Sequence, residues 1–352
     1  HHPTLRRQRQ MCIRDRPVRD NFNLEAGLRF ADYSTGNDTD AFKLGGYYQV
    51  NDQVSLRATV QTATRHGSIT ELYRGQGSSL TDLDPDPCGT DPETNIGPSY
   101  TQAQCANTGL PASLYGSDLK SPADQYNILT GGNPNLVPEE SESTTIGIVL
   151  TPDAIPGLTL TLDYFDIVVE DKIGTIPAST SLKNCLETGN PTFCNLIERD
   201  PIAGTLWVSP GQIITTNTNV AEESMTGFDL IFDYMLETGL GPIDIKGITT
   251  FTESNELTVM PGEAAIECAG YYGKSCGKNP MPEVAGNYTA SLSRGNLDYV
   301  FGMRYLGETE DLNTTAIDFE DKTYFDVTVN YQFSDSMSFT AGASNILDED
   351  PV

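Results

Sequence analysis

Three aspartates at alternate positions, Asp82, Asp84 and Asp86, are the first residues whose type and spacing suggest chemistry. Alternating carboxylates supply the hard oxygen ligands that Ca²⁺ prefers. The run lacks the glycine turn and the distal glutamate of an EF-hand loop. A solvated acidic loop is therefore the default interpretation and a calcium site is the alternative. We expect no other metal site and no cofactor.

Six cysteines fall into three local pairs, each inside a polar segment rich in Gly, Pro or Asn. The pairs are Cys88 with Cys105, Cys185 with Cys194, and Cys268 with Cys276. We predict disulfides, and hence an oxidising compartment. Metal thiolates are the alternative, but no CxxC spacing and no nearby histidine supports them.

Catalytic patterns are missing from the sequence. His66 is the only histidine after His1 and His2, and there is no nucleophile elbow, zinc-protease motif or phosphate-binding loop. Asp229 and Asp233 alternate along one stretch, which is typical of a solvated face rather than of an acid–base pair. We therefore expect no enzyme. A formal charge of −28 argues against a nucleic-acid partner.

Aromatic side chains in polar segments are candidates for ligand contacts. An aromatic ring in a loop can stack on a sugar or on an aromatic ligand, but it can equally pack one loop against another. The predicted ligand contacts are Tyr73, Tyr115, Tyr126 and Trp207.

The stretches between these segments alternate apolar and polar residues. In residues 324–333, Phe325, Val327 and Val329 share one face and Asp326 and Thr328 share the other. A period of two with one apolar face predicts a β-strand. About eleven such strands are predicted, at 21–33, 41–50, 54–61, 143–150, 158–165, 226–236, 243–251, 287–293, 297–305, 324–333 and 337–343.

The connections between these strands alternate between short turns and long loops. The long loops cover about residues 66–138, 174–214, 256–280 and 308–321. Strands of about ten residues, one apolar face and long loops on one rim are typical of a transmembrane β-barrel. A soluble β-sandwich also alternates, but it does not explain the asymmetric loops. We therefore predict an all-β, antiparallel transmembrane barrel with long extracellular loops and short periplasmic turns.

The first twenty residues differ from the rest of the chain. Their six arginines and two aspartates give a formal charge of +4, which leaves −32 for residues 21–352. They contain no apolar core, so they do not form a signal peptide. We predict that residues 1–20 are a non-native or disordered leader; a basic periplasmic turn is the alternative.

Residues 132–141, GNPNLVPEES, resemble the GNPxLxPE(T/S)S signature of TonB-dependent outer-membrane receptors. Weaker resemblances lie at residues 55–59, at 163–173 and at 343–348, where SNILD resembles the family's NLFD element. The signature residues are Gly132, Asn133, Pro134, Leu136, Pro138 and Glu139.

This resemblance implies a 22-stranded barrel, of which residues 21–352 are the C-terminal half. The plug domain, its coupling box and the last strand would then lie outside the chain. It implies uptake, at the bacterial outer membrane, of a small-molecule ligand of the siderophore, cobalamin or saccharide class. The implied partners are outer-membrane lipid and an inner-membrane energy-coupling protein. A passive porin-like channel and a secreted, disulfide-bonded β-sandwich that binds a partner are the alternatives.

Overall fold

The computed structural model describes the backbone of residues 7–13 and all atoms of residues 21–34, 38–260, 264–273, 276, 279–312 and 318–351. The chain forms two compact units. The sheet unit comprises His1–Thr64, Glu140–Glu170 and Glu222–Val352, and the loop unit comprises Arg65–Glu139 and Asp171–Ala221. The predicted leader partly overlaps the described backbone, where a strand covers residues 7–13. Its origin stays a prediction.

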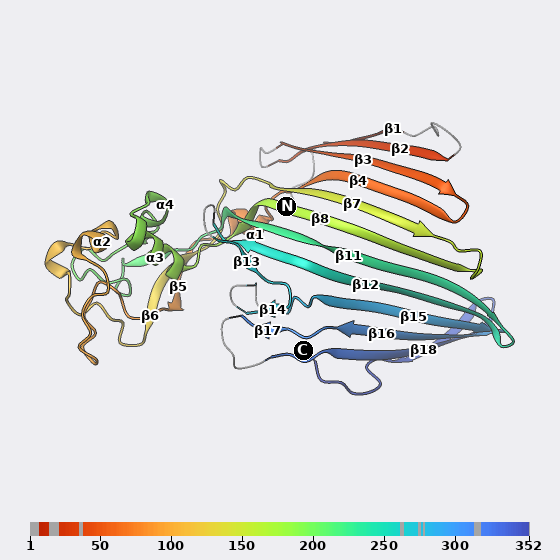
Figure 1. Cartoon of the computed structure of the whole chain (residues 1–352). Helices are drawn as coiled ribbons and strands as arrows, with labels where there is room; N and C mark the ends of the chain where they lie inside the picture. Colours follow the sequence, from red (N-terminus) through yellow and green to blue (C-terminus); the bar gives the residue numbers. More distant parts are fainter. Residues whose placement is uncertain are drawn as a thin grey trace. The chain divides into compact units, whose positions relative to one another are not determined.

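One antiparallel sheet makes up most of the sheet unit, and the strands along its main path follow each other in chain order (Figure 1). The path is β1 (Arg7–Ile13), β2 (Phe22–Asp32), β3 (Asp38–Asn51), β4 (Val54–Arg65), β7 (Glu139–Leu150), β8 (Leu158–Gly174), β11 (Thr218–Thr238), β12 (Gly241–Thr258), β15 (Val284–Arg294), β16 (Leu297–Leu306), β18 (Lys322–Ser334) and β19 (Met337–Ala343). From β2 onward, each strand of this path corresponds to one predicted strand. Short β13 (Ile266–Glu267) pairs with β12, and β14 (Tyr271–Tyr272) pairs with β17 (Glu310–Asp311).

The strand register confirms the predicted faces. Phe228 lies opposite Phe251, and Leu236 lies opposite Ile243, so apolar residues of β11 and β12 share one side of the sheet. Directly opposed side chains on a face are the pairs that stabilise a sheet. On the other side, Lys246 pairs with Asp233, and their charged groups are 3.3 Å apart.

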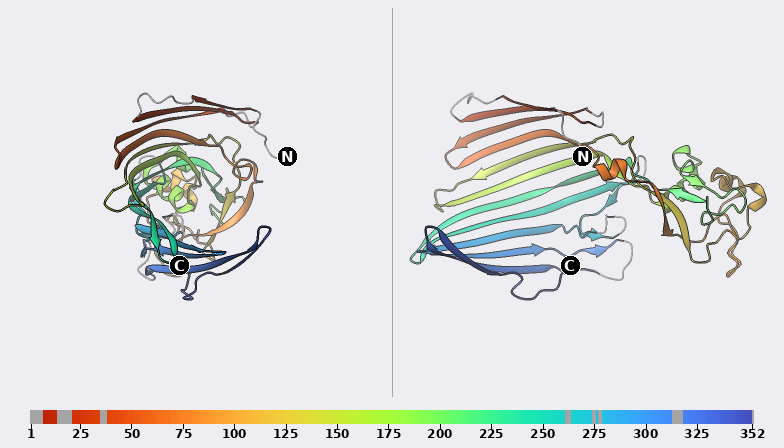
Figure 2. Two further views of the ribbon diagram at one scale, coloured as in Figure 1. Left: turned by 90° about the vertical axis from the view of Figure 1, so that its right-hand side faces the viewer. Right: turned by 180° about the vertical axis from the view of Figure 1, so that it is seen from behind.

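The apolar face of the sheet is exposed, which decides between barrel and sandwich. Leu28 is 49% exposed, Leu44 55%, Ile146 58% and Phe301 51%. A sandwich buries such rows between two sheets, whereas a transmembrane barrel turns them outward toward lipid. Seen end-on, the strands follow an open arc with β1 and β19 at its edges, the curvature of part of a barrel (Figure 2).

Several strands are longer than predicted. β8 has 17 residues, β12 has 18 and β11 has 21. Apolar alternation ends where a strand leaves the apolar band, but backbone pairing continues beyond it: Glu223 still lies opposite Leu257. The sequence pattern therefore marks the apolar band rather than the full length of the strand.

The loop unit has secondary structure of its own, although the sequence predicted two long loops without regular elements. Its helices are α1 (Ile69–Tyr73), α2 (Gln102–Asn107), a 3₁₀ turn η1 (Ala112–Leu114), α3 (Ala178–Thr188) and α4 (Pro191–Cys194). A small sheet runs in the order β5 (Gly77–Asp82), β6 (Gln125–Thr130), β10 (Gln212–Ile214), β9 (Ile197–Glu198). Most of these elements are too short for periodicity to reveal them. The exception is α3, whose eleven residues bury one face at helical spacing that the sequence reading overlooked: Ala178, Ser181, Leu182, Cys185 and Leu186. None of the helices in the described part of the chain is long and apolar enough to cross a bilayer.

Candidate functional site

The signature residues form a tight turn that packs against α1. The Leu136 N–H donates to the Asn133 carbonyl, and the Asn133 side chain accepts from the Asn135 N–H at 2.9 Å. Pro134 follows Asn133, at the turn position that suits its fixed φ. Leu136 is 3% exposed, and Pro138 immediately precedes β7.

Gly132 permits the close approach of this turn to α1. Its N–H donates to the Arg74 carbonyl at 2.9 Å. A Cβ at this position would lie 2.7 Å from backbone atoms of Leu72 and Arg74. The glycine of the signature is therefore required by packing against a helix backbone.

Arg65, the last residue of β4, joins the signature glutamate to α1. Its Nη2 lies 2.6 Å from Glu139 Oε1, and its Nη1 lies 3.0 Å from Glu71 Oε2. Arg65 Nε also donates to Glu139 Oε2. Glu139 Oε1 in addition accepts from the Ile173 N–H at 2.8 Å, near the end of β8. Glu139 thus connects the ends of three strands.

Glu71 also completes the N-terminal cap of α1. Its Oε2 accepts from the Ser68 N–H at 2.7 Å, and Ser68 Oγ accepts from the Glu71 N–H. This reciprocal pattern is a capping box. The hydrogen bonds from Arg65, which outweigh the opposing effect of burial, lower the pKa of Glu71 below its ordinary value.

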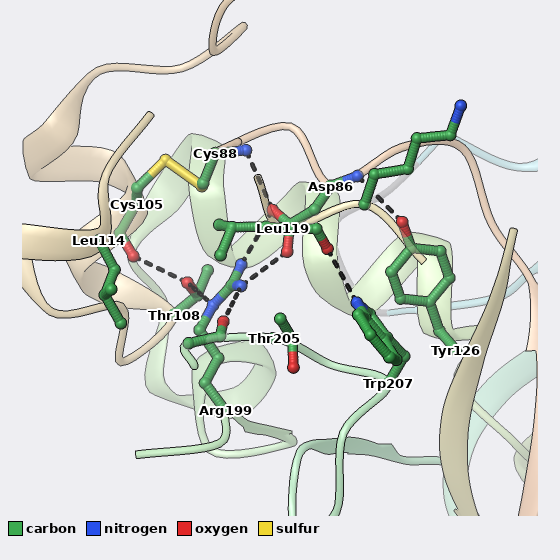
Figure 3. Close-up of polar contacts among 12 residues, drawn as sticks. Asp86, Cys88, Cys105, Thr108, Leu114, Leu119, Tyr126, Arg199, Thr205 and Trp207 are labelled. Atoms are coloured by element: carbon green, nitrogen blue, oxygen red, sulfur yellow. Dashed lines mark hydrogen bonds and ion pairs between the residues drawn. A yellow bond between two sulfur atoms is a disulfide. The ribbon is translucent and has the colours of Figure 1, made fainter. Parts of the chain in front are cut away.

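A buried ion pair, Asp86 with Arg199, organises the middle of the two loop segments, residues 77–130 and 178–214, which we call the distal part of the loop unit (Figure 3). The side chains are 0% and 1% exposed, and Nη1 lies 2.6 Å from Oδ2. Arg199 also donates to Thr108 Oγ1 at 2.8 Å and to the Gly204 carbonyl at 2.8 Å. Because its donors meet a carboxylate, a hydroxyl and a carbonyl, the buried charge is compensated.

This pair bears on the calcium interpretation of the aspartate run. The Asp86 carboxylate accepts from Arg199 and from the Cys88 N–H. It is the counter-ion of a guanidinium and is not available to a cation. Among the described residues, no group of three or more His, Cys, Asp or Glu side chains is arranged to hold a metal ion.

The four predicted ligand contacts have different surroundings. Tyr73 is 55% exposed at the end of α1, whereas Tyr126 is 1% exposed. The Tyr126 hydroxyl accepts from the Asp86 N–H at 3.2 Å, and burial raises the pKa of this phenol. Trp207 donates to the Leu119 carbonyl at 3.2 Å (Figure 3), and Tyr115 donates to the Tyr100 carbonyl at 2.9 Å. The hydroxyl of Tyr126 and the indole of Trp207 thus serve the interior of the loop unit, and ligand contact stays a prediction for all four residues.

Three disulfides lie in the described part of the chain, between the cysteines that the sequence paired. They are Cys88–Cys105, Cys185–Cys194 and Cys268–Cys276. The first adjoins the buried ion pair, because Thr108, which accepts from Arg199, donates to the Cys105 carbonyl. The second links α3 to α4. The third lies in the sheet unit next to Glu267, whose carboxylate accepts from the Asn255 and Ala269 N–H groups.

The sequence alone did not reveal Arg65 and Arg199, the two arginines whose side chains hold the contacts described above. Each acts on a partner far away in the chain; Arg65 and Glu139 are separated by 74 positions and Arg199 and Asp86 by 113. No local spacing signals such pairs. Only the signature glutamate, Glu139, pointed to one of these contacts.

The fold and its faces define the class of protein: part of an antiparallel barrel with apolar residues on its outer side. The sequence profile of the family described as TonB dependent receptor-like, beta-barrel matches residues 15–346. The chain belongs to this family. No curated protein sequence matches it.

Solved structures of larger receptors share this fold. The ferric enterobactin receptor PfeA from Pseudomonas aeruginosa superposes with a TM-score of 0.58 at 14% identity, over 95% of this chain and 39% of that one. The siderophore receptor PirA from Acinetobacter baumannii gives a TM-score of 0.55 at 17% identity, over 95% and 40%. The copper transporter OprC gives 0.51 at 12%, over 96% and 42%. The chain thus spans about two fifths of the length of these proteins, and the likeness concerns the fold.

Proposed function

We propose that the chain forms part of a bacterial outer-membrane receptor that takes up a scarce small-molecule ligand. One observation carries the proposal. The chain belongs to this receptor family, and its sheet has one side of exposed apolar residues and an opposite, polar side that holds ion pairs. Apolar rows suit lipid, and the polar face suits the inside of a barrel.

The ligand belongs to the siderophore, cobalamin or saccharide class in this proposal. Support comes from the neighbours, since PfeA is named a ferric enterobactin receptor and PirA a siderophore receptor. The folded loop unit supplies a surface for capture, with Tyr73 as its exposed aromatic residue. Residues 21–352 are the C-terminal half of the barrel in this proposal. Receptor segments N-terminal to them couple uptake to an inner-membrane energy-transducing protein. In this proposal, residues 1–20 are a non-native or disordered leader.

Uptake by cells that carry or lack the whole receptor gene tests the proposal. Radiolabelled ferric siderophores, cobalamin and oligosaccharides are supplied one at a time, with and without a protonophore. We expect receptor-dependent uptake of one class that stops when the proton gradient collapses. Receptor-dependent uptake at the same rate with and without the protonophore would show a passive channel instead. Recovery of the protein from culture supernatant without detergent would show a secreted binding protein.

The extent of the chain has its own test. Sequencing the genomic locus should show a plug-encoding segment upstream of residue 21 and codons other than those of residues 1–20. A continuous native reading frame through residues 1–20 would contradict the leader proposal while leaving the uptake proposal standing.

A further inference from the structure

The loop unit is built from two segments that belong to different strand connections. The first runs from β4 to β7, and the second runs from β8 to β11. They share one small sheet, in which Ile128 of β6 lies opposite Ile213 of β10. The Asn127 side chain also donates to the Gly211 carbonyl at 2.9 Å. The distal parts of the two segments therefore form one folded structure.

Their bases are joined separately, by a triangle of Glu71, Asn133 and Asn217 that we call the loop clasp. Asn133 Nδ2 donates to the Asn217 carbonyl at 3.0 Å, and Asn217 Nδ2 donates to the Glu71 carbonyl at 3.0 Å. The Asn133 N–H closes the triangle by donating to the Glu71 carbonyl at 2.9 Å. Each side-chain bond of the clasp crosses from one segment to the other.

The backbone next to the clasp adds two more crossings. The Asn217 N–H donates to the Gly131 carbonyl at 3.2 Å, and the Thr215 N–H donates to the Leu129 carbonyl at 2.9 Å. Movement of the second segment away from the first must break all of these bonds together. Joint loss of several hydrogen bonds makes separation of the bases cooperative.

Asn219, two residues after Asn217, also bonds the first segment through its side-chain amide. Its Oδ1 accepts from the Val137 N–H at 2.9 Å, and its Nδ2 lies 3.0 Å from the Val137 carbonyl and 2.7 Å from the Asp171 carbonyl. The Asn219 side chain thus bonds both backbone groups of Val137, as the backbone of a paired strand would. It also bonds the Asp171 carbonyl of β8. The spacing of two places Asn217 and Asn219 on the same side of an extended segment.

A cavity of about 220 Å³ adjoins the clasp, and both segments line it. Asn133 comes from the first segment, and Asn217, Thr216 and Ile214 come from the second. No charged side chain is among its lining residues. A ligand group that enters this cavity meets both segments at the point where the clasp joins them.

We propose that Asn217 is a positioning residue that couples the two segments, so that a ligand captured by one segment moves the other with it. The functional part of this inference rests on the proposed uptake, whereas the coupling itself is a property of the chain. Asn217 is suited to this role because its backbone N–H, carbonyl and side chain all engage the first segment.

Amide hydrogen exchange on the whole receptor, purified and returned to lipid vesicles, tests the coupling. In Asn217→Ala we expect exchange about tenfold faster at the Gly132 and Asn133 amides. The lost bond holds the Glu71 carbonyl on α1, which accepts from Asn133, and Arg74, which accepts from Gly132, caps the same helix. Those amides belong to the first segment, although the substitution lies in the second. The reciprocal variant, Asn133→Ala, should accelerate exchange at Thr215 and Asn217.

Asn190→Ala is the matched control. Asn190 caps α4 within the second segment by accepting from the Thr192 N–H at 3.0 Å. In the described part of the chain, no hydrogen bond joins it to the clasp. It should change exchange only around α4. Faster exchange confined to the substituted segment in both clasp variants, or equal acceleration at Gly132 in the control, would overturn the coupling. If the two clasp variants accelerate exchange in the opposite segment as expected, but the unmodified receptor takes up none of the ligands in the transport assay, the coupling stands and only the proposed function is overturned.

Discussion

Arg57 of β4 and Asp163 of β8 form an ion pair across the intervening strand β7. Arg57 Nε lies 2.8 Å from Asp163 Oδ1, and the second guanidinium nitrogen contacts the other carboxylate oxygen. The two side chains meet over Gly147 of β7, where a Cβ would lie 1.8 Å from Asp163 Oδ1. A missing side chain on one strand thus allows its two neighbours to be linked on the polar face.

This arrangement predicts that Gly147→Ala destabilises the sheet. The added methyl must displace Asp163, and the combined cost of crowding and of the weakened pair is about 1–3 kcal/mol. Aliquots in SDS are heated to a series of temperatures before electrophoresis, and the midpoint of the change from folded to unfolded mobility measures this cost. Gly27→Ala is the matched control, because a Cβ there meets nothing closer than 3.9 Å. Equal midpoints for the two variants would contradict the prediction.

Arg199→Ala should unfold the distal part of the loop unit without disturbing the sheet. It leaves the Asp86 carboxylate buried without its counter-ion, at a cost of about 3–5 kcal/mol. Limited proteolysis of the membrane-embedded receptor should show new cleavage between residues 84 and 120. Glu93→Gln, which alters a carboxylate that is 76% exposed, serves as the control and should leave the cleavage pattern unchanged.

The junction at α1 should loosen in acid. Hydrogen bonds from Arg65 lower the pKa of Glu71 below the ordinary 4.5. A lowered folded-state pKa contributes stability that is fully present above the unfolded value and is lost as pH falls through the folded one. Exchange at Arg74, corrected for the intrinsic rate, should therefore rise below pH 4.5.

Glu71→Gln separates this effect from general acid unfolding. The variant should weaken the junction at neutral pH and flatten its acid dependence. Glu139 also binds Arg65. Burial raises the pKa of Glu139, but the hydrogen bonds from Arg65 and from the Ile173 N–H outweigh it and lower that pKa below its ordinary value, so part of the acid dependence should survive in the variant. An unchanged pH profile in Glu71→Gln would exclude Glu71 as the cause.

Access to the disulfides should differ within the loop unit. Cys88 and Cys105 are both 0% exposed, whereas Cys194 is partly exposed beside a buried Cys185. In the folded receptor, a thiol reductant should open Cys185–Cys194 first, because exchange requires access to a sulfur. Mass spectrometry of alkylated peptides, in a Cys12→Ser background, gives the order. Prior opening of Cys88–Cys105 would count against the burial seen here.

A charge on the outer face should impair insertion into membranes. Phe228 is 38% exposed and lies opposite Phe251 on the apolar side. Phe228→Arg should cost up to about 2–4 kcal/mol in lipid, depending on its depth in the bilayer. Folding yield into phospholipid vesicles measures the loss, and Phe228→Leu, which keeps the site apolar, should fold normally. Equal yields would mean that this face does not meet lipid.

The sequence alone determined the sheet, because the cue for a strand is local. Alternation from Leu24 to Ala343 marked each strand from β2 onward and its apolar face, and the short turns fixed the antiparallel order. The cysteine pairs were equally local, separated by 17, 9 and 8 positions. The signature at residues 132–141 indicated the family that the sequence profile then matched.

Only the tertiary structure decided what holds the loops. The two segments that the sequence predicted to be irregular fold together because Arg199 binds Asp86 and because Asn217 donates to the Glu71 carbonyl, 146 positions away in the chain. Such contacts leave no periodic trace in the chain, since any arginine or asparagine in a polar segment looks the same. The burial of Tyr126 and the exposure of Tyr73 were undecided for the same reason: a side chain in a loop is buried or exposed according to which distant segment packs on it.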